Sequence, residues 1–77
     1  MDIENNSYKT LSDRAKEILG KVNYLQIKRF VEKEKDRGTS TQRISWKLNS
    51  RNGFEALREY KVSEIKEVVR FVLNGAN

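Results

Sequence analysis

The sequence predicts a small all-α domain, a compact bundle of four to five short helices. Proline is absent and the four glycines stand far apart, so they mark helix ends and do not loosen the chain. Apolar residues recur at spacings of three and four, the period of a helix with one buried face. Alternation of β-branched or aromatic residues with polar ones is lacking over a useful length, although the turn residues Asn52–Gly53 would suit a short hairpin.

The first predicted helix follows a polar, unpatterned stretch. We expect residues 1–7 to form a disordered arm and residues 8–75 to form a single helical domain. Either Thr10 or Ser12 can cap this helix, and Gly20 ends or bends it. Its apolar face comprises Leu11, Ala15, Ile18, Leu19 and Val22.

The second helix is predicted over residues 23–37 and stops at Gly38. Its apolar stripe comprises Tyr24, Ile27 and Val31. Residues 32–37 alternate in charge, so we expect this end of the helix to be solvated.

The third helix is predicted to begin at Thr39 and to run to about Leu48. Thr39 and Gln42 have the spacing of a capping box, in which each side chain satisfies an otherwise unpaired backbone N–H. Residues 49–53 favour turn geometry.

Two further helices are predicted in the C-terminal third of the chain. A short one spans residues 54–60, and Ser63 caps the last one, for which Asn74–Gly75 form the C-cap. The last helix has a broad apolar face made of Ile65, Val68, Val69, Val72 and Leu73.

The composition excludes several classes of protein. A chain of 77 residues suffices for one domain, which buries about 60–65% of its unfolded surface. Cysteine and histidine are both absent, so we expect no disulfide, no metal site and no cofactor, and we expect no enzyme, because the commonest general base is missing. The acidic pairs Glu55–Glu59 and Glu64–Glu67 are interpreted as solvated edges. No apolar run reaches about 18 residues and no signal peptide is recognised, which predicts a cytoplasmic protein without a membrane partner.

The positive charge is concentrated in the middle of the chain, whose overall net charge is +5. Residues 21–51 hold nine basic and three acidic side chains, a net charge of +6, whereas residues 1–20 carry −1 and residues 52–77 are balanced. Such a distribution is expected of a patch that meets a polyanion. The plainer interpretation is that these side chains only keep a small domain soluble.

The outer face of the third helix is the candidate binding surface, because helical geometry turns Thr41, Ile44 and Leu48 inward. Phosphate contacts are predicted for Lys28, Arg29, Arg43, Lys47 and Arg51. Base contacts are predicted for Gln42, Asn49, Asn52 and Arg58. Trp46 stands opposite the inward stripe, and we expect a neighbouring helix, such as the last one, to cover it; a stacking platform or a subunit contact is the alternative.

Residues 27–60 are similar to the core of a helix-turn-helix or winged-helix protein when the turn is placed at Asn49. The positions that this class keeps buried or small are then filled by Ile44, Ser45 and Leu48. A recognition helix would lie near residues 51–60, although Gly53 falls inside it and no wing follows. It would present Arg51, Asn52, Arg58 and Lys61 to DNA.

These observations favour a nucleic-acid-binding module, in particular a DNA-binding regulator of transcription or replication. A homodimer would enlarge its small binding surface, and Phe71 of the last helix, outside the main apolar stripe, could supply the contact. The alternative is a protein-interaction adaptor or inhibitor that docks on an acidic partner through the same basic face and Trp46, since tryptophan and arginine are enriched at binding hot spots.

Overall fold

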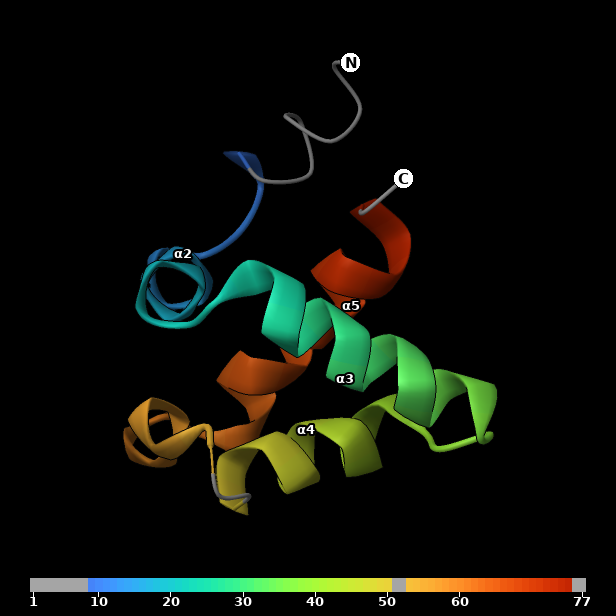
Figure 1. The fold of residues 1–77 in the computed structure, drawn as a ribbon. Coiled ribbons are helices and arrows are strands. Elements are labelled where there is room, and N and C mark those ends of the chain that lie inside the picture. Colours follow the sequence, from blue (N-terminus) through green and yellow to red (C-terminus); the bar gives the residue numbers. More distant parts are fainter. Residues whose placement is uncertain (1–8, 51–52, 76–77) are drawn as a thin grey trace.

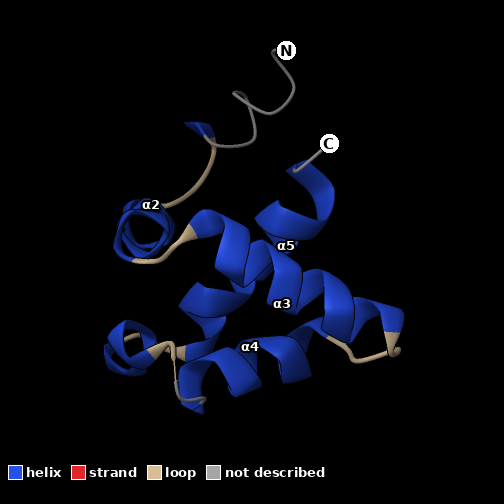
Figure 2. Cartoon of the chain, viewed as in Figure 1, coloured by secondary structure: helices blue, strands red, loops and turns tan. Residues whose placement is uncertain are grey.

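The computed structural model describes residues 9–50 and 53–75, and over these ranges it contains helices and no strand (Figure 2). The prediction of an all-α domain is therefore confirmed, whereas the arm expected at residues 1–7 lies outside the described residues. The elements are α2 (Asp13–Lys21), α3 (Tyr24–Asp36), α4 (Thr41–Ser50), the 3-10 helix η1 (Glu55–Glu59) and α5 (Val62–Gly75).

Helix α5 lies at the centre of the fold and contacts α2, α3 and α4. Figure 1 shows α3 and α4 side by side and running in opposite directions, with α5 behind α3 and α2 at one end of the assembly. The core formed between them comprises Ala15, Ile18, Ile27, Val31, Ile44, Leu48, Phe54, Leu57, Tyr60, Ile65, Val68, Val69 and Val72. The apolar stripes expected for the predicted helices therefore meet in one core around α5.

The ends of α2 and α3 follow local capping chemistry. Ser12 caps α2, because its hydroxyl accepts a hydrogen bond from the backbone N–H of Ala15 at 3.2 Å. Gly20 is the penultimate residue of α2, so of the two predictions for it, an end or a bend of the helix, the helix end falls one residue later, at Lys21. Gly38, with φ of 87°, ends α3 as predicted, and the N–H of Thr39 donates to the carbonyl of Glu34 in the manner of a Schellman motif.

The starts of α4 and α5 differ from the predicted caps. The Ser40 hydroxyl, not that of Thr39, accepts from the backbone N–H of Arg43 at 3.2 Å, because Thr39 is already used to close the end of α3. The predicted capping box is therefore wrong. Ser63 lies within the first turn of α5, which begins at Val62, and the Glu64 carboxylate accepts from the N–H of Lys61 at 2.9 Å.

The predicted fourth helix is a 3-10 helix of five residues. Leu57 is the buried side chain of η1, and the two residues that flank the helix, Phe54 and Tyr60, are also buried. The segment is thus anchored to the core at its middle and at both ends. The helix-turn-helix interpretation is not confirmed, because an α-helix is required where the structure has η1.

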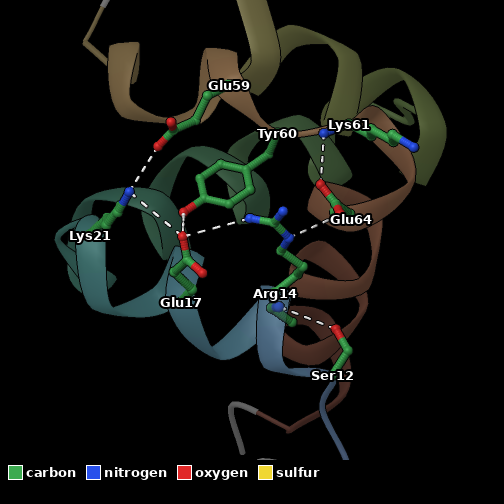
Figure 3. Close-up of polar contacts among 9 residues, drawn as sticks. Ser12, Arg14, Glu17, Lys21, Glu59, Tyr60, Lys61 and Glu64 are labelled. Carbon is green, nitrogen blue, oxygen red and sulfur yellow. Dashed lines mark hydrogen bonds and ion pairs between the residues drawn. The ribbon is translucent and has the colours of Figure 1, made fainter.

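A polar network that sequence analysis did not identify joins α2 to η1 and α5 (Figure 3). The Tyr60 hydroxyl donates to Glu17 at 2.6 Å, and Lys21 donates to Glu59 at 2.8 Å. Arg14 lies 3.6 Å from Glu64. The hydrogen bond from Tyr60 lowers the pKa of Glu17, and the same bond raises the pKa of Tyr60. Glu59 and Glu64, interpreted above as solvated edges, are thus partners of α2.

Truncation of a buried side chain of α5 should destabilise the domain strongly. Ile65 is fully buried, so Ile65→Ala is expected to lower the free energy of unfolding by about 2–5 kcal/mol. Leu25→Ala serves as the control, because Leu25 is 62% exposed and its truncation should change this free energy by less than about 0.5 kcal/mol. Urea denaturation followed by circular dichroism measures both values, and equal effects would contradict the central role of α5.

Candidate functional site

Glu34 lies at the junction of α3 and α4 and is only 5% exposed. Its carboxylate accepts hydrogen bonds from Lys47 at 2.9 Å and from the Thr39 hydroxyl at 2.8 Å, and Arg37 lies 3.6 Å away. The hydrogen bond from Lys47, followed by that from Thr39, lowers the pKa of Glu34. The expectation that the end of α3 is solvated is therefore wrong for Glu34, because α4 folds back against this turn.

Basic side chains stand four residues apart on each of α3 and α4. Residues with this spacing lie on one line, or row, of a helix, and the ion pairs of Glu34 with Arg37 and Lys47 bring the end of the α3 row close to α4. We call the two rows together the α3–α4 surface, which consists of Arg29, Lys33 and Arg37 from α3 with Arg43 and Lys47 from α4. Sequence analysis missed Lys33 and Arg37, although the same four-residue spacing on both sides of Gly38 was a usable signal.

The four predicted phosphate contacts that the structure describes fall into three groups. Arg29 and Arg43 are exposed, and within residues 9–50 and 53–75 neither forms an ion pair. Lys47 belongs to the same surface but is bound to Glu34. Lys28 is half-buried on the other flank of α3 and pairs with its neighbour Glu32 at 3.4 Å, so it does not join this surface. Arg51 lies outside the described residues.

The predicted base contacts are dispersed. Gln42 is exposed on α4, where its side-chain oxygen lies 3.4 Å from the ammonium of Lys66 in α5. Asn49 is half-buried and donates its amide protons to the carbonyls of Leu57 at 3.1 Å and Tyr60 at 3.0 Å, so it holds η1 against α4. Arg58 is exposed on η1. Asn52 lies outside the described residues.

Trp46 is 64% exposed, so the prediction that a neighbouring helix covers it is wrong. Helix α4 packs against α5 more extensively than any other pair of elements does, and the fully buried Ser45 shows which side of α4 is enclosed. Trp46 follows Ser45 and therefore projects about 100° further around the helix, away from the core. It lines an open depression of about 330 Å³ together with Ser40, Gln42 and Arg43.

Comparisons with models of protein families, with curated proteins and with solved structures give no match for this chain. Among the described helices, none has the length and apolar character needed to cross a membrane.

The buried carboxylate of Glu34 should make folding stability depend on pH. Its lowered pKa means that it stabilises the fold above the pKa of an unfolded glutamate, about 4.3, and that this contribution is lost as the pH falls through the lower pKa of the folded state. Glu34→Gln is therefore expected to be less stable than wild type at pH 7, with a difference that shrinks below about pH 4.

Urea unfolding of wild type and Glu34→Gln between about pH 3 and pH 7 measures this difference. The free energy of unfolding of Glu34→Gln is subtracted from that of wild type at each pH. This subtraction removes the contributions of Glu17 and Glu55, whose pKa values are also lowered. Glu32→Gln is the matched control, because Glu32 is an exposed carboxylate on the same helix. A stability difference that stays constant over this range would contradict the assigned role of Glu34.

Proposed function

We propose that this protein binds nucleic acid through the α3–α4 surface. The observation that carries the proposal is that the basic rows of α3 and α4 meet at Glu34, which pairs with Arg37 of one row and Lys47 of the other. Side chains four residues apart on a helix are separated by about 5–6 Å, so each row can contact successive phosphates of one strand. Lysine and arginine that neutralise phosphates release bound counterions, and this release supplies most of the affinity for a polyanion.

Glu34 has two opposing effects on this surface. It compensates part of the charge of Lys47 and Arg37, which weakens the attraction of both residues for phosphate. It also restrains the Lys47 and Arg37 side chains, so less side-chain freedom is lost when they bind phosphate. Arg29, Lys33 and Arg43 are the members of the surface that Glu34 does not contact, and we assign the main phosphate contacts to them.

An acidic protein partner is the second candidate, and the exposure of Trp46 favours it. Aromatic side chains flanked by arginine are frequent anchors of protein interfaces. The two candidates differ in their response to salt. Binding through about three phosphates should weaken roughly 20- to 40-fold between about 50 and 200 mM salt, whereas an interface anchored by a tryptophan should weaken much less.

The proposal predicts that Arg29→Ala/Lys33→Ala loses affinity for nucleic acid. Fluorescence anisotropy with a labelled single strand and the corresponding duplex, at several salt concentrations, measures the affinity and its dependence on salt. The double variant should bind more weakly, and the slope of log K against log salt should fall by about 2, roughly one for each phosphate contact removed.

Lys28→Ala/Lys35→Ala is the matched control. It removes the same charge from the same helix but from the flank that does not border α4, so its affinity should stay close to that of wild type. Equal losses in the two double variants would show that net charge alone causes binding and would refute the assigned surface. Absence of binding by wild type at about 50 mM salt would refute the proposed function.

A further inference from the structure

We infer that the bound nucleic acid is an unpaired strand, one base of which stacks on the ring of Trp46; this inference rests on the proposed function. Trp46 lies in the middle of α4 and is the most exposed of the large apolar side chains described. An indole ring provides a flat platform on which any base can stack, because every base has a π-face. Stacking of this kind explains why a tryptophan occupies a solvent-facing position of the helix.

The depression beside Trp46 has suitable size and chemistry for one base. It is an open depression of about 330 Å³, in which a base stacked on the ring keeps one side in solvent. Ser40, Gln42 and Arg43 form the rest of its lining and provide a hydroxyl, an amide and a guanidinium next to the ring. The amide of Gln42 can bond the edge of a stacked base, since amides both donate and accept.

Two cations are close to the depression. Arg43 lines it, and Lys66 of α5 contacts another of its lining residues, Gln42, at 3.4 Å. Helix α4 contains no acidic residue. The phosphates before and after a base stacked on Trp46 would therefore each find a positive side chain, which is the charge complementarity expected of a groove that follows a single strand.

A duplex fits this surface less well. Bases in a duplex are stacked on each other, so an indole ring reaches a base face only after the pair has opened. A helical protein that reads a duplex directly places an α-helix in the major groove, where its polar side chains reach base edges. On α4 the centre of the outer face is Trp46, the amide donors of Asn49 are engaged by η1, and η1 itself is a five-residue 3-10 helix.

The chain contains a single tryptophan, so its fluorescence reports directly on this site. The experiment titrates the protein at about 50 mM salt with a thymidine oligomer of about 12 nucleotides and with a hairpin duplex of mixed sequence. We expect the oligomer to quench Trp46 and to bind more tightly than the duplex. By anisotropy, Trp46→Ala should bind the oligomer roughly 5- to 100-fold more weakly, and Trp46→Phe should recover part of the loss.

Leu25→Ala is the matched control, because Leu25 is as exposed as Trp46 but lies on α3 away from the depression. It should leave the affinity for the oligomer unchanged. Circular dichroism and urea unfolding check that Trp46→Ala folds like wild type, as expected for a solvent-facing side chain.

The possible failures are distinguishable. If the duplex binds as tightly as the oligomer and neither quenches Trp46, the inference is wrong while the proposed function stands. If neither binds, the proposed function fails and the inference fails with it. If an acidic peptide quenches Trp46 and the oligomer does not, the site belongs to a protein partner and both proposals are overturned.

Discussion

Burial of the apolar face of α5 is the interaction on which the rest of the structure depends. Each of α2, α3 and α4 covers part of this face, and each buries its own apolar stripe in doing so. The chain has no cysteine, so no disulfide can compensate for a poor core. The exposed ion pairs between α2 and its neighbours orient that helix, but pairs of this kind contribute little to stability.

The same packing also produces the candidate binding surface. Helix α4 buries Ile44, Ser45 and Leu48 on one side. Trp46 lies on the other side of the helix and is therefore exposed to solvent. The turn at Gly38 reverses the chain, so α4 runs back beside α3 (Figure 1). Glu34 then pairs with Lys47 of α4 and with Arg37 at the end of α3. The surface is thus a consequence of how a helical hairpin rests on α5.

The proposed phosphate contacts and the proposed base stacking are separate physical contributions. Contacts of the basic rows with phosphate would not depend on base sequence and would weaken with added salt. Stacking on Trp46 would require a base that is free of its partner and would depend much less on salt. Because the two proposed contributions involve different side chains, substitution and ionic strength can separate them.

The sequence by itself determined the helical class, the apolar faces and the end of α3 at Gly38, because periodicity and capping involve residues within about four positions of each other. It also located the basic block. Only the tertiary structure decided the exposure of Trp46, the use of Asn49 to hold η1, and the pairing of Lys47 with Glu34, which lies 13 residues earlier. Such contacts depend on which sides of two helices meet, and local periodicity reveals the apolar side of a helix but not its partner.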